Sequence, residues 1–166
     1  MKIIRFISFL LIIGLPVFTQ AQSKEYKALL SEYYNDFPTI SCSTAKKKLD
    51  NENVYFLDTR EYSEFKVSHI KGAKRVGYDN FKMSSLKGIK KDAEIIVYCS
   101  IGARSQDIGE KLKKAGYTNV KNLFGGFFHW NNSGYEKVDS NGKKTSKIHG
   151  FSKEWSKWIT KGTIVY

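Results

Sequence analysis

The chain has 166 residues and a formal net charge of +12, with 28 lysine and arginine residues against 16 acidic ones. The lysines are dispersed, no run is longer than Lys46–Lys48, and no alternation of aromatic and basic residues typical of nucleic-acid binding accompanies them. We therefore expect no nucleic-acid partner and interpret the charge as a solvated basic face that raises the local concentration of anions.

Residues 1–21 are typical of a secretory signal peptide. Lys2 and Arg5 precede an apolar run from Phe6 to Phe18, and small side chains precede a cleavage site after Ala21. A membrane anchor is the alternative, but the run is short for a span of about 20 residues and contains a proline. We expect an exported protein, periplasmic or secreted, that meets the membrane only through this segment before cleavage. The rest of the chain suffices for one domain with a core.

An amphipathic helix is predicted within residues 22–37. Its apolar side chains recur at spacings of three and four, and Pro38 ends it. The stripe consists of Tyr26, Leu29, Leu30, Tyr33 and Phe37. We interpret this helix as packing on the domain rather than recognising a partner.

Between residues 38 and 139, short apolar strands alternate with short helices. Strands are predicted at 39–42, 54–57, 73–76, 95–98 and 120–123, and helical segments at 44–49, 61–65, 81–86 and 103–115. This alternation favours an α/β fold with a parallel sheet covered on both faces. Ligands of such sheets bind beyond the carboxyl ends of the strands.

Cys99 lies at the carboxyl end of the most apolar of these strands. It enters the loop Cys99-Ser100-Ile101-Gly102-Ala103-Arg104-Ser105, whose end begins a helix. Backbone N–H groups of such a loop, together with a helix N-terminus, point at the sulfur, favour its thiolate form and cradle an anion. An inert, buried cysteine is the alternative. We predict Cys99 as the catalytic nucleophile and residues 100–105 as the loop that binds the substrate and the negatively charged adduct on the sulfur.

The same loop resembles the active-site loop of rhodanese-like sulfurtransferases. Three further segments are similar to family motifs and follow in the family's order: Leu57-Asp58-Thr59-Arg60 with 61–65, His69-Ile70-Lys71-Gly72-Ala73, and Leu123-Phe124-Gly125-Gly126 with Trp130. The resemblance implies a three-layer α/β/α rhodanese-like fold with a five-stranded parallel sheet. It also implies a Cys99 persulfide that takes sulfur from a small anionic donor such as thiosulfate or a persulfide and passes it to a thiol or cyanide. No cofactor is implied, and no metal-ligand spacing is present.

The resemblance places Asp58 and Arg60 near the loop mouth. An ion pair that holds the scaffold is favoured there over contact with substrate. Arg104 either donates to an anionic donor or braces the loop by bonding its carbonyls. Some thiosulfate-using members carry a basic residue directly after the cysteine, whereas Ser100 and Ile101 are neutral. A larger, less charged donor, such as a polysulfide or a protein persulfide, is therefore an alternative.

Cys42 is the second cysteine of the chain. It is predicted at a strand end in a different element from Cys99, where simple packing explains it. We therefore expect no disulfide between the two, even in an oxidising compartment.

Residues 140–166 form a C-terminal extension beyond the usual family domain, after the polar segment Ser140–Lys144. Ser152 is predicted to cap a helix that runs to about Thr160 and carries Trp155 and Trp158 on one stripe. Packing onto the domain is favoured, and a protein partner at this stripe is the alternative.

Two other functions compete with sulfur transfer. One is a binding or regulatory module with vestigial catalysis, although retention of Cys99 and Arg104 weighs against it. The other is a phosphatase or arsenate reductase of the same fold. Related phosphatases carry C-x-x-x-x-x-R, one residue longer than the six from Cys99 to Arg104, and we expect the shorter loop to exclude a phosphoryl group.

Overall fold

The structure is a computed structural model and describes residues 24–34 and 36–166. The predicted signal peptide, 1–21, lies outside these residues. Within them, no helix has the length and apolar character needed to cross a membrane.

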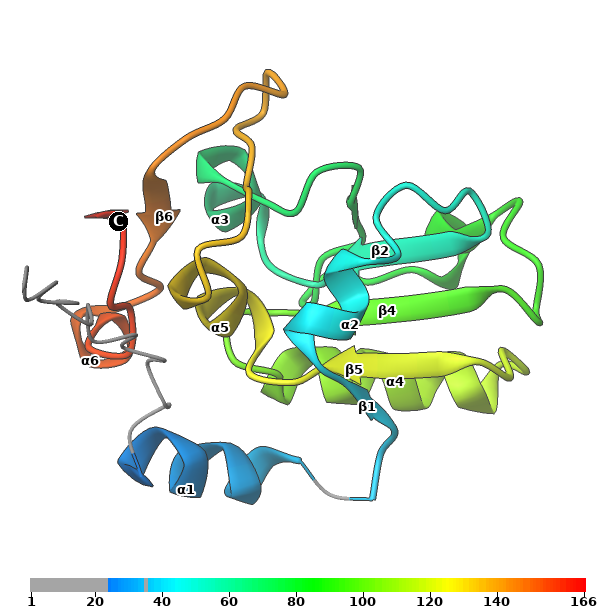
Figure 1. The fold of residues 1–166 in the computed structure, drawn as a ribbon. Coiled ribbons are helices and arrows are strands. Elements are labelled where there is room, and N and C mark those ends of the chain that lie inside the picture. The colour runs from blue at the N-terminus through cyan, green and yellow to red at the C-terminus, as the bar shows by residue number, and fades with distance from the viewer. Residues whose placement is uncertain (1–23, 35) are drawn as a thin grey trace, which may run out of the picture.

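Five parallel strands form the central sheet, in the order β1-β5-β4-β2-β3 (Figure 1). Their bounds are β1 Thr39–Ile40, β2 Val54–Asp58, β3 Lys74–Arg75, β4 Glu94–Tyr98 and β5 Val120–Leu123. The predicted five-stranded parallel sheet is therefore confirmed. The central strand β4 is buried on both faces, because successive side chains point to opposite sides: Ile95 and Val97 enter one core, and Ile96 and Tyr98 the other.

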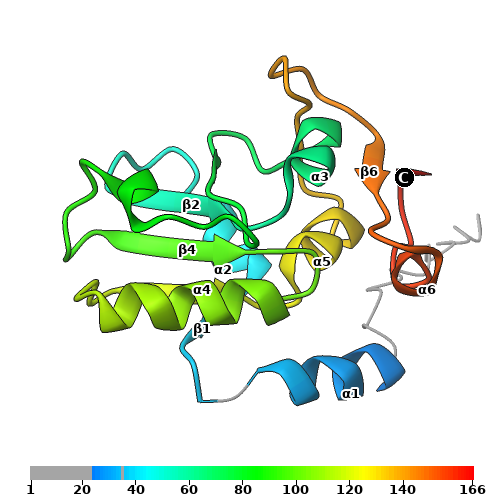
Figure 2. The same cartoon turned by 180° about the vertical axis from the view of Figure 1, so that it is seen from behind.

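Helices cover both faces of the sheet and give the expected three layers. Helix α4 (Ala103–Lys114) lies on one face, where Ile108 and Leu112 are fully buried. The 3-10 helix η1 (Met83–Leu86) shares that core through Leu86. Helices α2 (Cys42–Lys46) and α5 (Gly126–Asn132) lie on the other face. Strand β5 stands in front of α4 in Figure 1, and α4 in front of the sheet in Figure 2.

Cys99 lies where the strand order reverses direction. Strand β2 leads through α3 (Tyr62–Val67) to the edge strand β3, whereas β4 leads through α4 to β5 on the other side. Residues after β2 and β4 thus meet at one edge of the sheet, and the Thr59 N–H donates to the Tyr98 carbonyl at 2.9 Å. Such a switch point is the usual ligand site of open parallel sheets.

Helices α2 and α5 differ from the sequence prediction. Cys42 begins helix α2 instead of ending a strand, because the Ser41 side chain caps that helix by accepting the Thr44 N–H at 3.1 Å. Helix α5 was not predicted. It is short, almost wholly buried and rich in aromatic residues, so it has no polar face that would show a helical period.

The predicted C-terminal helix is shorter than expected. Helix α6 (Lys153–Ser156) begins after the Ser152 cap but ends well before Thr160. The Asn132 side chain explains this, because it donates to the Trp158 carbonyl at 2.7 Å and accepts the Thr160 N–H at 2.9 Å, taking backbone groups that a longer helix would need. Two short strands, β6 (Lys147–His149) and β7 (Thr163–Val165), form a separate parallel pair.

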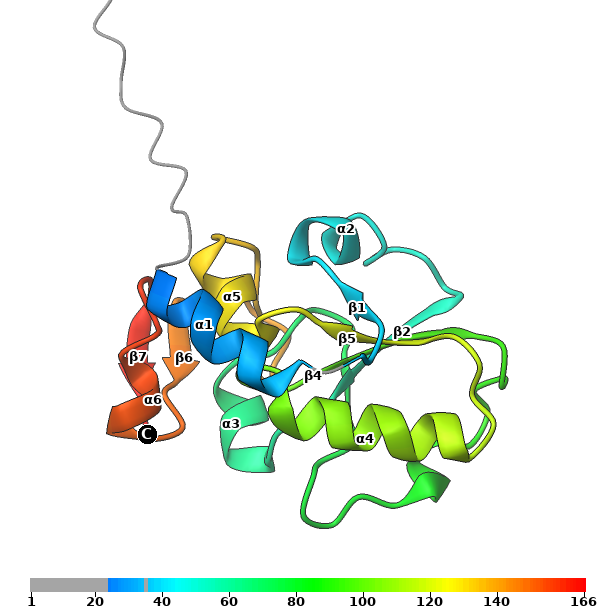
Figure 3. The ribbon, with the colours of Figure 1, turned by 90° about the horizontal axis from the view of Figure 1, so that it is seen from below.

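The N-terminal helix α1 (Lys24–Tyr33) packs beside the C-terminal extension (Figure 3). Tyr26 lies 5.2 Å from Trp158 and Tyr33 lies 6.2 Å from Trp155, measured between ring centroids. Packing within the chain therefore accounts for both indole rings, and a protein partner at this surface stays a prediction.

Candidate active site

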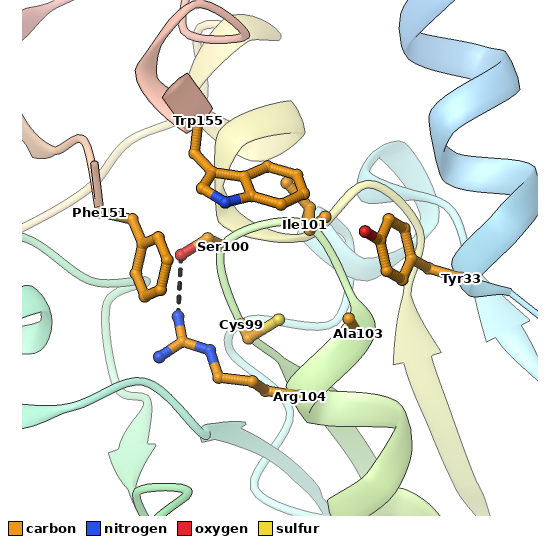
Figure 4. A pocket seen from close by; sticks show the side chains of 8 residues that line it. All are labelled: Tyr33, Cys99, Ser100, Ile101, Ala103, Arg104, Phe151 and Trp155. Carbon is orange, nitrogen blue, oxygen red and sulfur yellow. Dashed lines mark hydrogen bonds between the residues drawn. The ribbon is translucent and has the colours of Figure 1, made fainter. Parts of the chain in front are cut away.

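Strand β4 delivers Cys99 into a closed loop at the edge of the sheet. The Cys99 side chain is 1% exposed, and its Sγ atom accepts the Gly102 N–H at 3.1 Å. Figure 4 shows the sulfur on the inner side of the loop formed by Ser100, Ile101 and Ala103. The loop thus points one backbone N–H, that of Gly102, at the sulfur.

The N-terminus of α5 fixes the outer side of this loop. The Phe127 N–H donates to the Cys99 carbonyl at 2.8 Å, and the Phe128 N–H donates to the Ser100 carbonyl at 2.9 Å. Because a peptide group is planar and trans, the N–H groups that follow these carbonyls point away from α5. Gly126 makes the approach possible, since a Cβ there would lie 2.6 Å from the Cys99 carbonyl oxygen. This contact gives the Gly125–Gly126 motif a physical role.

Tyr34, directly after α1, braces the loop from a third side. Its hydroxyl lies 2.7 Å from the Ile101 carbonyl and 2.9 Å from the Leu123 carbonyl, and it accepts the Gly125 N–H at 2.8 Å. Burial raises the pKa of Tyr34 well above its ordinary value, so the hydroxyl keeps the proton that it donates. The sequence placed Tyr34 within the predicted amphipathic helix but outside its apolar stripe, and nothing in that pattern indicated a contact with the loop.

Glu64 of α3 is the second residue that sequence reasoning missed. In the sequence it is only one residue of a family motif, yet it accepts two hydrogen bonds from Arg104, each at 2.8 Å, and one from the Ser100 hydroxyl at 2.9 Å. Burial alone would raise the pKa of Glu64, but the hydrogen bond and charge of Arg104, with the charge of Arg60, outweigh it and lower the pKa. Glu64 is therefore a carboxylate at neutral pH.

Arg104 braces the loop through side chains instead of loop carbonyls. Besides the Glu64 pair, its Nη2 atom donates to the Ser100 hydroxyl at 3.1 Å (Figure 4). Burial would lower the pKa of Arg104, but the hydrogen bond to Glu64 and the negative charges nearby outweigh it and raise the pKa. A permanent charge is thus matched by a carboxylate within the site.

Ser105 holds the end of the loop. Its hydroxyl lies 3.0 Å from the Gly102 carbonyl and 2.8 Å from the Asn122 Oδ1 atom, and the Asn122 Nδ2 atom donates to the same carbonyl at 2.9 Å. The Gly102 carbonyl is thereby held away from the sulfur.

Asp58 and Arg60 form a fully buried ion pair. Arg60 donates to both Asp58 carboxylate oxygens and, at 2.8 Å, to the Ser68 carbonyl. Its guanidinium also lies 4.0 Å from the centroid of the Phe127 ring. Neither residue lines the pocket that contains Cys99. The structure places them in the scaffold that joins β2, the turn after α3 and α5. His69 is likewise a turn residue, stacked on Phe65 with centroids 3.7 Å apart.

A pocket of about 130 Å³ opens over the sulfur. It is lined by Tyr33, Cys99, Ser100, Ile101, Ala103, Arg104, Phe151 and Trp155. Across the described residues, no group of three or more His, Cys, Asp or Glu side chains could hold a metal ion. The site therefore combines one thiol, a backbone N–H that faces its sulfur and an aromatic mouth.

Cys42 provides a contrast with Cys99. Both thiols are free, and the Cys42 thiol donates to the Phe124 carbonyl at 3.6 Å. Burial raises the pKa of Cys42 to about 12, so this thiol stays protonated and unreactive.

Residues 41–133, more than half of the chain, match the Rhodanese-like domain family. The chain belongs to this family. Its matched segment starts at the cap of α2 and ends directly after α5, so it contains the Cys99 loop, Glu64 and Arg104. It excludes α1 and the C-terminal extension.

Curated relatives of this rhodanese-like domain carry sulfur-transfer names. The chain is 31% identical over 101 residues to a putative sulfur carrier protein, YrkF, of Bacillus subtilis. The match covers 60% of the chain and only 54% of that protein. A thiosulfate sulfurtransferase, GlpE, of Pseudoalteromonas translucida is 29% identical over 103 residues, which cover 62% of the chain and 97% of that enzyme.

Solved structures share the fold. A Bacillus halodurans protein has a TM-score of 0.58 at 20% identity, over 70% of the chain and 85% of its own. The rhodanese-like domain of an Anabaena protein has a TM-score of 0.57 at 23% identity, over 61% of the chain and 79% of its own. At these identities the likeness concerns the fold alone.

Proposed function

We propose that this protein is an exported sulfurtransferase that carries sulfane sulfur as a persulfide on Cys99. The observation that supports the proposal most directly is the position of the Cys99 Sγ atom, 3.1 Å from the Gly102 nitrogen and at the base of the pocket. The relatives named sulfurtransferase or sulfur carrier agree with this chemistry.

The reaction has two half-steps that use no cofactor. The Cys99 thiolate attacks the outer sulfur of thiosulfate, the S–S bond of the donor breaks, and sulfite leaves with the bonding electron pair. The terminal sulfur of the new persulfide then carries the negative charge. An acceptor thiolate or cyanide attacks that sulfur, and Cys99 leaves as the thiolate. A polysulfide or an organic persulfide loads Cys99 by the same displacement.

The loop contributes preorganised dipoles. The Gly102 N–H already faces the sulfur, and the bonds from α5 and Tyr34 fix the loop before substrate arrives. Such fixed donors stabilise developing negative charge without reorganising during the reaction. Glu64 and Arg104 position the Ser100 side of the loop in the same way.

Intact-mass spectrometry tests the proposal. Protein incubated with polysulfide or thiosulfate and then freed of small molecules should gain one sulfur atom, and cyanide should remove it. The Cys99→Ser variant should gain none, whereas the matched Cys42→Ser variant should load like the wild type. A sulfur that persists in Cys99→Ser, or that maps to Cys42, would contradict the assignment.

Export is the second element of the proposal, and the sequence of residues 1–21 is its support. Expression of the full chain in a bacterial host, followed by fractionation and N-terminal sequencing, should recover mature protein that begins at Gln22 outside the cytoplasm. Retention of the full-length chain in the cytoplasm would contradict it.

A further inference from the structure

Three aromatic rings wall the mouth of the Cys99 pocket, and none belongs to the segment matched to the family. Tyr33 comes from α1, and Phe151 and Trp155 come from the C-terminal extension, whereas the match covers 41–133. Figure 4 shows the rings around the opening, with Trp155 over the Ser100 and Ile101 part of the loop and Tyr33 and Phe151 on two sides. The parts of the chain outside the family domain thus determine which groups can approach the sulfur.

The positive charge of Arg104 is already balanced by the Glu64 carboxylate. Arg104 is the one charged side chain among the described residues that line it. Both terminal nitrogens of Arg104 donate to Glu64, and its guanidinium carbon lies 4.9 Å from the centroid of the Phe151 ring. A small dianion such as thiosulfate would have to compete with the Glu64 carboxylate for this cation. An uncharged organic group gains contact with the rings without that competition.

Phe151 is held in a backbone conformation that disfavours its side chain. Its φ is 63°, the only positive φ of a non-glycine residue in the described part of the chain. The Phe151 N–H donates to the His149 Nδ1 atom at 3.0 Å, and the ring stays 47% exposed while it faces Arg104. Strained residues are retained chiefly where they serve a ligand. Here the strained backbone holds the Phe151 ring at the pocket mouth, where the ring contributes little to the core.

The size of the pocket limits the group that it can hold. Its volume of about 130 Å³ is close to that of an engineered apolar cavity of about 150 Å³ that binds benzene. One aromatic ring or a short branched alkyl group fits within this volume.

We propose that the aromatic mouth binds the organic part of a low-molecular-weight persulfide or thiol that bears one apolar or aromatic group. This proposal rests on the proposed function and names its substrate class. In loading, the Cys99 thiolate attacks the terminal sulfur of R–S–SH, the S–S bond breaks, and R–S⁻ leaves while Cys99 becomes the hydropersulfide. In unloading, R–S⁻ takes the terminal sulfur back and releases the Cys99 thiolate. One site therefore recognises R in both directions.

Two thiols of similar acidity, phenylmethanethiol and 2-mercaptoethanol, test the proposal. Wild-type protein loaded with inorganic polysulfide should be unloaded by phenylmethanethiol with a kcat/KM on the order of tenfold higher, since burying one aromatic ring stabilises binding by about that factor. A second arm compares loading by phenylmethyl hydropersulfide with loading by inorganic polysulfide. Because one site recognises R in both directions, the preference for the phenylmethyl group should appear in both arms, and its absence from the unloading arm would contradict the proposal.

The Phe151→Gly variant removes one wall ring at a position whose φ suits glycine, so the backbone should be retained. Its preference for phenylmethanethiol over 2-mercaptoethanol should fall several-fold, and the preference of a Trp155→Leu variant should fall likewise. The preference is the ratio of the two thiols within one variant, so a change in loading by polysulfide does not enter it. The control is Tyr62→Ala, which removes a 60% exposed ring that does not line the pocket and should keep the preference. Equal rates for the two thiols in the wild type, or a preference that survives both wall variants, would overturn the proposal. Absence of any Cys99 persulfide with every donor would instead overturn the proposed function.

Discussion

The hydroxyl of Tyr34 occupies the space that a side chain on Gly102 would need. A Cβ on Gly102 would collide with the Tyr34 Oη and Cζ atoms, and the φ of 123° at Gly102 independently favours glycine. The glycine of the active-site loop therefore has two functions. It donates its N–H to the Cys99 sulfur, and it makes room for the group that braces the loop.

Tyr34→Phe should lower the rate of sulfur transfer even under conditions where the variant is fully folded. The change leaves the Gly125 N–H without its partner and releases the Ile101 carbonyl, which should cost about 1–3 kcal/mol of unfolding free energy. At temperatures where the variant is fully folded, we expect a severalfold lower kcat for persulfide transfer, because the loop amides are less well fixed. Tyr55→Phe is the matched control, since Tyr55 makes no side-chain hydrogen bond in the described part of the chain. Urea titration and stopped-flow turnover measure the two effects, and an unchanged kcat in folded Tyr34→Phe would refute the bracing role.

Gly102→Ala should be rescued in part by removing the Tyr34 ring. The single substitution places a Cβ at a strained φ and in collision with Tyr34. We therefore expect it to lower the free energy of unfolding by at least about 3 kcal/mol. The double variant Gly102→Ala/Tyr34→Ala relieves the collision but keeps the strain. A double-mutant cycle on unfolding free energies should therefore show a favourable coupling between the two changes. Strict additivity would mean that the collision is not what makes glycine necessary.

The sequence predicted the sheet and the position of the Cys99 loop at the end of a strand, because both depend on local patterns. Continuous apolar strands such as residues 95–98 follow from burial on both faces, and the loop after them follows from glycine and the helix start at Ala103. Helix α5 escaped prediction for the opposite reason. Its aromatic residues are buried on all sides, so no period of apolar and polar residues marks it.

The residues that support the nucleophile depend on contacts between distant parts of the chain. Tyr34 reaches Ile101 across 67 positions and Glu64 reaches Arg104 across 40. Tyr33, Phe151 and Trp155 meet over the pocket although more than a hundred residues separate the first from the others. No local sequence pattern predicts contacts between such distant residues, so the aromatic mouth could be found only in the structure.

Glu64→Gln should weaken the fold in a pH-dependent manner. The folded pKa of Glu64 lies below its ordinary value of 4.5, so the carboxylate contributes stability that is fully present above 4.5 and is lost as the pH falls through the folded value. Near neutral pH, we expect the free energy of unfolding of the wild type to exceed that of the variant by about 3 kcal/mol, because the half-buried Arg104 loses its counter-charge in the variant. The difference should shrink as the pH falls below 4.5. Urea titrations at several pH values measure it, with the exposed Glu52→Gln as control. A difference that does not depend on pH would mean that the charge of Glu64 is not what matters.

Arg60→Ala should reduce stability and leave substrate binding intact. It leaves the fully buried Asp58 carboxylate without its partner, which should cost about 3–5 kcal/mol. Because neither residue lines the pocket, the KM for the sulfur donor in the remaining folded protein should equal that of the wild type. Cooling or a stabilising osmolyte keeps enough variant folded for the assay. A raised KM with normal stability would instead assign Arg60 to the substrate.

The last prediction concerns the length of the loop. Six residues from Cys99 to Arg104 close around the sulfur, and the bonds from α5 to the Cys99 and Ser100 carbonyls leave no slack for a wider ring. Gly126 could not move inward to compensate, since a Cβ there would already touch three loop atoms. We therefore expect no meaningful hydrolysis of aryl phosphates and only weak inhibition of sulfur transfer by phosphate or arsenate. Insertion of one glycine after Ile101 adds up to about 3.3–3.6 Å of chain and should separate the Gly102 N–H from the sulfur, so sulfur transfer should fall while binding of phosphate rises. Insertion of one glycine in the exposed turn at Asn141 is the matched control and should change neither property. Robust phosphatase turnover by the unmodified protein, lost in Cys99→Ser, would show that loop length does not discriminate the two chemistries.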